Sequence, residues 1–545
     1  MSIKIAYQEV PANAENPVWT VTNGSFSADM GIGTSEYASS SVYSQKDGDY
    51  PFTEPLTITA SFGNEPLFKG FSVGFSSTAY CTRIKVTFTS GQVTHSEVFR
   101  PISGAYAYYS RALPTPYTSI TFEFLGANAP NATIITDFFQ LGQVTMFTGA
   151  DLIGFPQITQ EACPVGTELP FDTSEIKLFL PDGAPRFQRW DRYTIMSGSA
   201  PIARHYIDTV ERDGNIYAVK GISIVGVLAD MDYDGFFLDS GTISTVNMLR
   251  SVANNTAPGY ANSVPEVAQF IVDSSFDDDG EEAPYPYPGE YRGNLPPGPR
   301  RDALHRVVQA LGALLQTLPN GRLQLLPCPS GAGNATSIPT SAIFAGSVSL
   351  QRKTPYSSLS LSTYTHTADA ETTIWSGTIP AGTFRIVFSA PCYITSVTEG
   401  VTLTMPSGST YAWWATIMAS STTAVTVTGI PLKAVENVNV TTYTTDAGAV
   451  ENPLTISGND FYLYDGPNGA ANGNALNGYY SSIRQNAELT FKMACSSVVP
   501  EIGSRYSVEL ASGTMTGWAT KIITTLSNAN RYAEVTLTGI WEDAE

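Results

Sequence analysis

Alternation of apolar and polar residues is the dominant pattern of this chain. It is clear in LTITASF (56–62), GFSVGFS (70–76), RIKVTFT (83–89) and SITFEFLG (119–126). A period of two residues places one row of side chains on a buried face and the next row in water, which predicts β-strands. Gly, Pro, Asn and Asp separate these segments, so we expect a β-sandwich over residues 1–145.

The next segment, 146–260, combines strands with one predicted helix. EIKLFLPDG (175–183) and DRYTIMSG (191–198) predict strands, and RHYIDTVERDGNIYAVKGISIVGVLAD (204–230) predicts a hairpin that turns at RDGN and ends in an apolar packing segment. Residues 239–255 predict a helix, because Thr242 is a suitable N-cap for apolar residues at helical spacing.

Residues 261–350 contain a loop followed by the strongest helical pattern. An acidic, Pro- and Gly-rich stretch over 273–300 predicts an exposed loop. Its Asp277, Asp278 and Asp279 are oxygen ligands that suit calcium, but they lack the spacing of a calcium loop, so a solvated acidic loop is the favoured interpretation. From residue 300 an apolar stripe predicts a helix that ends at PNG (319–321), before the strand RLQLLP. The stripe consists of Leu304, Val307, Val308, Leu311 and Leu315.

The last two segments are again rich in strands. Residues 351–450 alternate strongly in GTFRIVFSAPCYITSVTEGVTLTM and TAVTVTGIPL, which predicts a small β-domain. Over 451–545 the segments 488–497, 502–510 and 532–540 predict three strands of a small barrel.

Composition narrows the class of protein. The 545 residues include 49 acidic and 29 basic side chains, a net charge of −20, which argues against a nucleic-acid-binding groove. The first ten residues lack the apolar stretch of a secretory signal, and no apolar run is long enough to span a membrane, so we expect synthesis in a cytoplasm. The cysteines lie far apart and predict buried free thiols: Cys81, Cys163, Cys328, Cys392 and Cys495.

Candidate chemistry is sparse. The chain has no GxSxG, phosphate-loop, HExxH or dinucleotide motif, and its four histidines have no metal-ligand spacing, so we predict no catalytic residue, metal site or cofactor. His305 is expected to pack or to face solvent. One group of acids is open to interpretation as a carboxylate cluster or as turn and surface charges: Asp208, Glu211, Asp230, Asp232 and Asp234.

Aromatic residues offer candidate sugar-stacking positions in the two outer β-domains. The alternative for each is packing in a core or at a sandwich edge. The candidates are Trp19, Tyr106, Tyr108, Tyr109, Trp413 and Trp414.

The order of several segments resembles a known family. ELPFDTSEIKLFLPDG, then YIDTVERDGNIYAVKGISIVGVLAD, then RRDALHRVVQALGALLQTLPNGRLQLLP is similar to baseplate hub or tail-tip proteins of bacteriophages and prophages. ITDFFQLGQVTMFTGADLIGF resembles the junction after a galactose-binding-like domain in prophage hubs. NPLTISGNDFYLYD, EIGSRYSVELASG and GWATKIITTLSNANRYAEVTLTG resemble the second barrel of such hubs. The segment 351–450 departs from this pattern.

The resemblance implies a fold and a role. The fold would be mainly β, with tandem tube-type β-barrel hub domains at 146–260 and 451–545, a few short helices, an N-terminal galactose-binding-like sandwich and an inserted small β-domain. The role would be a homotrimeric hub in the virion that joins the tail tube to the tip, contacts distal tail and tape-measure proteins, and forms part of the channel for DNA ejection. The acidic balance would suit a channel that repels DNA.

Two other functions stay open. A carbohydrate-binding, host-adhesion protein would use the outer β-domains on host surface glycans. A wall-degrading enzyme would need a carboxylate pair that the sequence neither identifies nor excludes.

Overall fold

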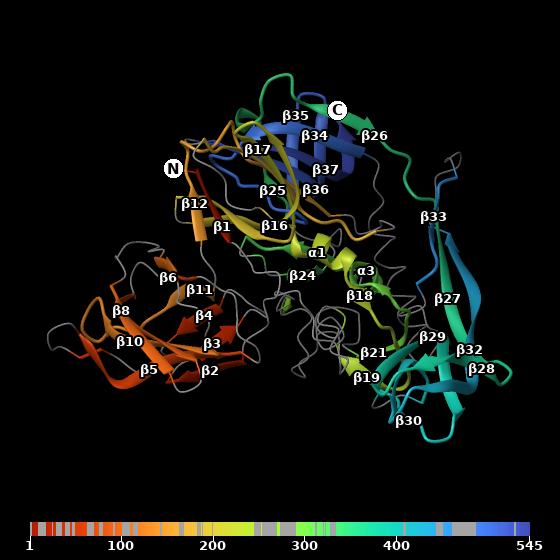
Figure 1. Ribbon diagram of the computed structural model, residues 1–545. Helices are drawn as coiled ribbons and strands as arrows, with labels where there is room; N and C mark the ends of the chain where they lie inside the picture. The colour runs from red at the N-terminus through yellow and green to blue at the C-terminus, as the bar shows by residue number, and fades with distance from the viewer. Residues whose placement is uncertain are drawn as a thin grey trace.

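The computed structural model is mainly β, as predicted, and its largest element is a sheet of 13 strands. The residues that it describes are 3–8, 18–23, 25–28, 35–38, 44–45, 50–62, 70–75, 80–90, 93–100, 109–112, 118–141, 144–162, 168–181, 187, 189–198, 200–244, 252, 270–272, 290–310, 313–319, 321, 323–327, 334–406, 410–442, 451–459, 487–527 and 530–544. In Figure 1 the large sheet forms the upper body, and two β-rich lobes lie below it.

The large sheet combines strands from both ends of the chain. Its main path runs β12-β1-β15-β16-β17-β14-β13-β36-β37-β34-β26, and β35 pairs with both β36 and β25. The strands are β1 (Ile3–Gln8), β12 (Val144–Phe147), β13 (Gln157–Glu161), β14 (Thr173–Phe179), β15 (Arg192–Ser197), β16 (Ala200–Asp213), β17 (Ile216–Ile222), β25 (Thr336–Ser337), β26 (Ser349–Arg352), β34 (Ala487–Ala494), β35 (Arg505–Leu510), β36 (Gly513–Leu526) and β37 (Arg531–Asp543).

One lobe is the N-terminal sandwich. It has a five-stranded sheet, a three-stranded sheet and a short hairpin, and its core contains the predicted apolar rows, such as Ile84 and Val86. The five strands are β2 (Val18–Thr22), β5 (Pro51–Ser61), β10 (Ser119–Ala127), β7 (Cys81–Ser90) and β8 (Val93–Phe99). The others are β11 (Thr136–Leu141), β6 (Gly70–Phe75) and β9 (Tyr109–Ala112), with β3 (Ser25–Ala28) and β4 (Ser35–Ala38) as the hairpin.

The second lobe is a seven-stranded unit from the middle of the chain. Its two longest strands are β29 and β32, and a core of its own lies beneath them. The strands are β27 (Ser358–Ala368), β28 (Thr372–Ile379), β29 (Gly382–Val397), β30 (Thr402–Thr404), β31 (Ala412–Ala419), β32 (Thr423–Thr442) and β33 (Pro453–Ile456).

Short elements connect the body with this second lobe. Apolar residues of α1, α3 and β27 join those of β34 and β37 in one core. The elements are α1 (Ile224–Val227), η1 (Leu228–Asp230), β18 (Asp232–Tyr233), β19 (Phe236–Ser244), β20 (Phe270–Val272), β21 (Glu290–Leu295), β22 (Gly298–Pro299), α3 (Arg300–Ala310), β23 (Ala313–Thr317), β24 (Leu323–Pro327) and η3 (Thr340–Ala342).

Three segment boundaries differ from the sequence predictions. β1 lies in the segment predicted as the sandwich and β12 spans its end at residue 145, but both are hydrogen-bonded in the large sheet, so the described chain starts in the body and leaves it for the sandwich. β33 falls in the segment predicted as the last barrel but pairs with β27, while β26, at the predicted boundary near residue 350, pairs with β34 of the last segment. Hydrogen bonds between distant strands set these boundaries, and local alternation does not encode them.

Two predicted helices are also corrected. The helix predicted from residue 300 ends at Ala310, and Ala313–Thr317 forms a hairpin with Leu323–Pro327 instead. A short apolar run is compatible with either structure, and β24 provides a partner that selects the strand. In the helix predicted over 239–255, Asp239 to Ser244 belong to β19, which pairs with β21. The predicted hairpin of β16 and β17 is confirmed, with Gly214 in its turn at φ 57°.

Of the cysteines, Cys81 and Cys392 are buried free thiols, as predicted, and Cys495 is a half-buried one. The described residues do not include Cys163, Cys328 or the acidic loop that contains Asp277, Asp278 and Asp279.

Candidate functional site: the polar face of the joined sheet

The two halves of the large sheet meet at one antiparallel joint. β13 pairs with β36 from Gln157 opposite Thr525 to Glu161 opposite Lys521. Residues directly opposite each other in such a pair have side chains on the same face. The face therefore continues across the joint, from β16, β17, β14 and β13 to β36, β37 and β34.

Alternation decides which residues occupy each face. In β34, Leu489, Phe491 and Met493 have no exposed surface and lie in the core, while Glu488 and Lys492 point the other way. β37 repeats the pattern with Val535 and Leu537 in the core. The register places the following residues on the outer face, which we call the polar face: Thr209, Glu211, Asp213, Lys220, Thr173, Glu175, Lys177, Gln157, Thr159, Glu161, Lys521, Thr525, Glu534, Thr536, Thr538, Glu488, Thr490 and Lys492. It also places Phe179, Ile216, Ile523, Ile540 and Glu542 there, as separate apolar positions and one more acid.

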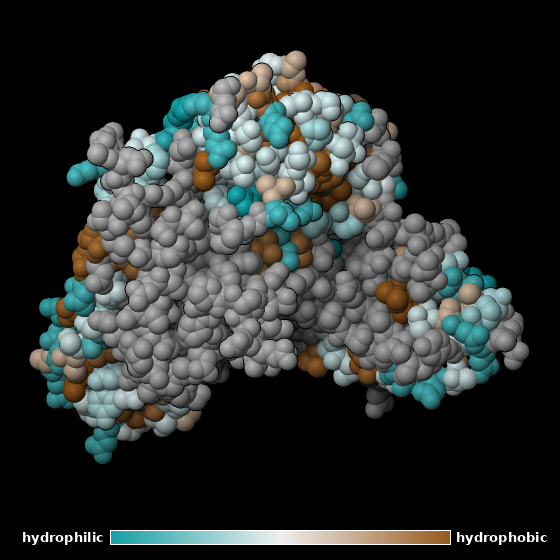
Figure 2. Space-filling model, turned by 180° about the vertical axis from the view of Figure 1, so that it is seen from behind, coloured by the Kyte–Doolittle hydropathy of each residue, from teal (hydrophilic) through white to brown (hydrophobic). Residues whose placement is uncertain are grey.

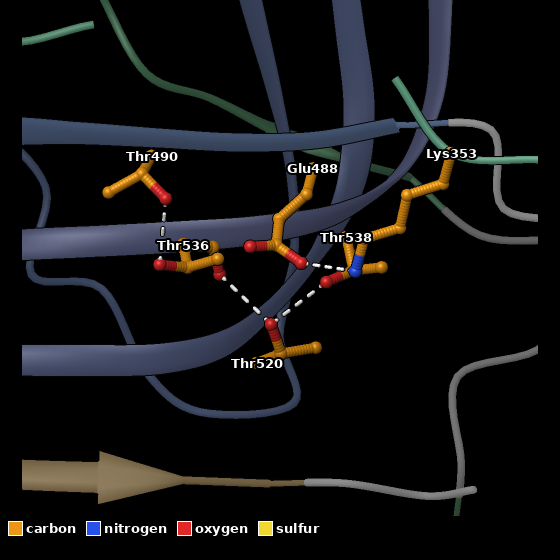
Figure 3. Close-up of polar contacts among 6 residues, drawn as sticks. All are labelled: Lys353, Glu488, Thr490, Thr520, Thr536 and Thr538. Carbon is orange, nitrogen blue, oxygen red and sulfur yellow. Dashed lines mark hydrogen bonds and ion pairs between the residues drawn. The ribbon is translucent and has the colours of Figure 1, made fainter. Parts of the chain in front are cut away.

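Threonine hydroxyls on this face bond to one another across strands (Figure 3). The Oγ1 atoms of Thr490 and Thr536 are 3.0 Å apart, and those of Thr520 and Thr538 are 2.9 Å apart. Thr520 Oγ1 also donates to the carbonyl oxygen of Thr536 at 3.3 Å. A bulge between Ala519 and Lys521 turns Thr520 toward this row. These hydroxyls are therefore occupied by protein partners.

Lysine–glutamate pairs accompany the threonines. The pair at the joint, Lys521–Glu161, has an N–O distance of 2.6 Å. The others are Lys220–Glu211 at 3.2 Å, Lys492–Glu534 at 3.4 Å, Lys177–Glu175 at 3.7 Å and Lys353–Glu488, in which Lys353 reaches the face from just after β26.

The electrostatic effect of these pairs is local neutralisation. Their side chains are 29% to 71% exposed, so each pair contributes only about 0–1 kcal/mol to stability. Five lysines nevertheless meet five glutamates, and Asp213, at the β16–β17 turn, and Glu542, near the end of β37, add two acidic charges. The face is close to neutral in a chain of net charge −20. Figure 2 shows mainly teal and white residues over the coloured part of the upper body, with brown residues in separate patches.

The five acids that the sequence left open as a carboxylate cluster or as turn and surface charges do not assemble as a single group. Arg189 bridges Asp208 at 3.5 Å and Asp230 at 2.5 Å, and Glu211 belongs to the polar face. Asp234 is buried at a different contact. Within the described part of the chain, no group of three or more His, Cys, Asp or Glu residues is arranged to hold a metal ion.

Asp234 joins the body to the second lobe. Its carboxylate lies 2.6 Å from Arg385 of β29, and the two side chains are only 8% and 10% exposed. The Arg385 guanidinium stacks 3.6 Å from the ring centre of Trp414. Arg300, also buried, donates from Nε to the carbonyl oxygen of Asp232 at 3.0 Å, and burial lowers its pKa while Asp234 and Asp232 oppose that shift. We call this contact the lobe joint.

The lobe joint explains two of the candidate sugar-stacking residues. Trp413 and Trp414 are 8% and 6% exposed, and Trp413 Nε1 donates to Asn294 Oδ1 at 2.6 Å. Gly235 has φ +89°, and a Cβ there would lie 2.7 Å from Trp413 Cγ, so this position requires glycine. Both rings fill the joint and do not form an open platform, which corrects that candidate assignment.

The sandwich candidates are placed only in part. Trp19 is half-buried against the sandwich core. Tyr106, Tyr108 and the side chain of Tyr109 lie outside the described residues. His305 is a half-buried residue of α3.

A buried polar network lies beneath the first half of the sheet, and local sequence patterns did not predict it. Ser174 Oγ bonds to Tyr193 Oη at 2.7 Å and to His205 Nδ1, and Tyr7 donates to Asp191. Burial lowers the pKa of His205 to about 3 and raises that of Tyr193. The histidine is therefore a neutral structural partner at physiological pH.

Asp172 is a second buried group near the joint. Burial raises its pKa to about 7, and a hydrogen bond from Gln160 Nε2 at 3.3 Å partly offsets this rise.

No helix in the described part of the chain is long and apolar enough to cross a bilayer.

Comparisons with known proteins identify weak structural likeness only. No family model and no curated protein matches the chain. Among solved structures, it is similar to the 43 kDa tail protein of prophage MuSo2 from Shewanella oneidensis, with 11% identity over 72% of this chain and 95% of that one and a TM-score of 0.40. It is similar to a tail protein from Neisseria meningitidis MC58, with 10% identity over 72% and 93% and a TM-score of 0.41. It is also similar to prophage tail protein gp18 from Listeria monocytogenes EGD-e, with 9% identity over 72% and 91% and a TM-score of 0.38. Two of these neighbours are named as prophage tail proteins, and the third as a tail protein.

Proposed function

We propose that this protein is a structural subunit of a phage tail tip. Three copies would form a hub that joins the tail tube to the tip and surrounds part of the path of DNA ejection. The proposal assigns it no reaction and no cofactor, places it in the virion, and makes tube, distal tail and tape-measure proteins its partners.

The joined sheet is the observation that carries the proposal. Two half sheets of one chain meet edge to edge at β13 and β36, so the chain already contains one joint of the kind that a ring needs. Among the described strands, β12 and β26 end the sheet path, each with a single neighbour. An unpaired strand edge tends to pair with another chain, and closing a ring satisfies every edge.

The β26 end also has apolar residues suited to an interface. Phe344, Val348 and Leu350 are 41%, 38% and 36% exposed. The proposed number of three copies comes from the resemblance of the sequence to hub proteins. The exposed edge at β26 is the surface proposed for contact between copies.

Native mass spectrometry of the purified protein tests the proposal. We expect a species of three times 58.4 kDa, and a ring with a central channel in electron micrographs. Leu350→Lys would place a charge at the edge of β26 and should shift the protein toward monomer. Val98→Lys, on an outer strand of the sandwich where Val98 is 54% exposed, is the matched control and should leave the trimer intact. A parent protein that stays monomeric at all concentrations and on preformed tail tubes would contradict the proposal.

A further inference from the structure

We propose that the polar face is the wall along which duplex DNA passes, and that its lysine–glutamate pairs keep this wall from holding the DNA. This inference rests on the proposed function, because it needs a ring around a DNA path. It replaces the expectation of an acidic, repelling channel with a neutral one.

The placement of the other elements determines which face of the sheet turns inward. The apolar side of β34 and β37 shares its core with α1, α3 and β27, the stem of the second lobe. The second lobe lies below the body in Figure 1, beside α1 and α3, which share this core, and the sandwich lies below the body on the other side, near β1 and β12. A ring whose copies carry such lobes has room for them only on its outside. The polar face, opposite to them, is then the face left for the inside.

Charge pairing determines how this face would act on DNA. An unpaired lysine binds a phosphate and releases a counterion, and a row of such lysines would retain the duplex. Here each lysine ammonium lies within 3.7 Å of a glutamate, so it is already compensated. The threonine hydroxyls in Figure 3 are likewise bonded to each other or to the backbone. A wall that is neither basic nor strongly acidic offers DNA no adhesion and little repulsion.

The first test removes the glutamates and keeps the lysines. We would measure fluorescence anisotropy of a labelled DNA duplex at about 50 mM salt, where nonspecific binding is strong. The parent protein should not bind. The fourfold variant should bind with a Kd of about 1–100 µM, the range of nonspecific complexes, and a log–log salt slope near −4, about −0.9 for each freed lysine. Its substitutions are Glu161→Gln, Glu175→Gln, Glu488→Gln and Glu534→Gln.

Two further variants control for net charge and for folding. A twofold variant, Glu161→Gln with Glu534→Gln, should give a slope near −2, about half that of the fourfold variant. A matched variant with the same total charge change elsewhere should not bind. It carries Glu97→Gln, Glu123→Gln, Glu371→Gln and Glu399→Gln, and Glu123→Gln frees Lys85 from a comparable exposed pair on the sandwich. Binding by the parent, or equal binding by the matched variant, would overturn the inference, as would no binding by a folded fourfold variant.

A reconstruction of the assembled ring by electron cryomicroscopy tests the location. The polar face on the channel wall is the expected result. The same face on the outside of a ring with a channel would overturn this inference and leave the proposed function standing. Absence of any ring, including on tail tubes, would overturn both.

Discussion

The lobe joint gives a prediction with a local readout. Arg385→Met keeps the apolar stem over Trp414 and removes the charge that compensates Asp234, which is 8% exposed at its side chain. Breaking a buried ion pair from one side typically costs about 3–5 kcal/mol, because the other charge stays buried without its partner. Unfolding of the second lobe breaks this contact, so the whole cost should appear as lost stability of that lobe.

Cys392 reports on this lobe alone. Its thiol is 2% exposed and lies in the lobe's own core, while Cys81, with no exposed surface, lies in the sandwich core. Labelling with an alkylating reagent in the native state, followed by peptide mass spectrometry, measures how often each core opens. At about 1.4 kcal/mol for each factor of ten, Arg385→Met should accelerate labelling of Cys392 by about 100- to 4,000-fold and leave Cys81 unchanged.

The double variant Asp234→Asn with Arg385→Met separates charge from packing. It removes the Asp234 carboxylate that is left without Arg385 and should recover part of the stability of the second lobe, though Arg300 loses one of the acids near it. Acceleration of less than about fivefold in Arg385→Met would refute the reasoning, since a pair worth so little is not a buried one. Equal acceleration at Cys81 would show global unfolding instead.

Three further predictions concern stability of the large sheet. The pKa of His205 falls from about 6.5 in the unfolded chain to about 3, so its contribution to stability is present above pH 6.5 and is lost as the pH falls toward 3. His205→Gln should therefore flatten the dependence of the melting temperature on pH between pH 6.5 and 4, and an unchanged slope would contradict this. The pKa of Asp172 rises to about 7, so burial of its charged form costs stability as the pH rises from about 4 through 7. Asp172→Asn should raise the melting temperature at pH 8 and have little effect at pH 4. An equal gain in melting temperature at both pH values would contradict this prediction. Gly221→Ala would place a Cβ 2.0 Å from Tyr193 Oη and should cost about 1–3 kcal/mol in urea unfolding, whereas no shift in the midpoint would show that the ring moves freely.

Local sequence determined most strands and the face that each side chain occupies. Alternation in 488–497 and 532–540 predicted strands, and in β34 and β37 the apolar row is indeed buried. The hairpin of β16 and β17 followed from the alternation of its residues and from its turn residues. These features are local because a period of two residues fixes the side of the backbone on which each side chain lies.

The tertiary structure decided which strands meet. The joint between β13 and β36, the position of β1 next to β15, and the end of α3 before β23 all depend on partners far away in the chain. The polar face has the same origin, since Glu161 and Lys521 become a pair only after the two half sheets join. A sequence states the alternation of each strand, but the order of strands follows from the hydrogen bonds and cores that distant segments share, and those exist only in the folded chain.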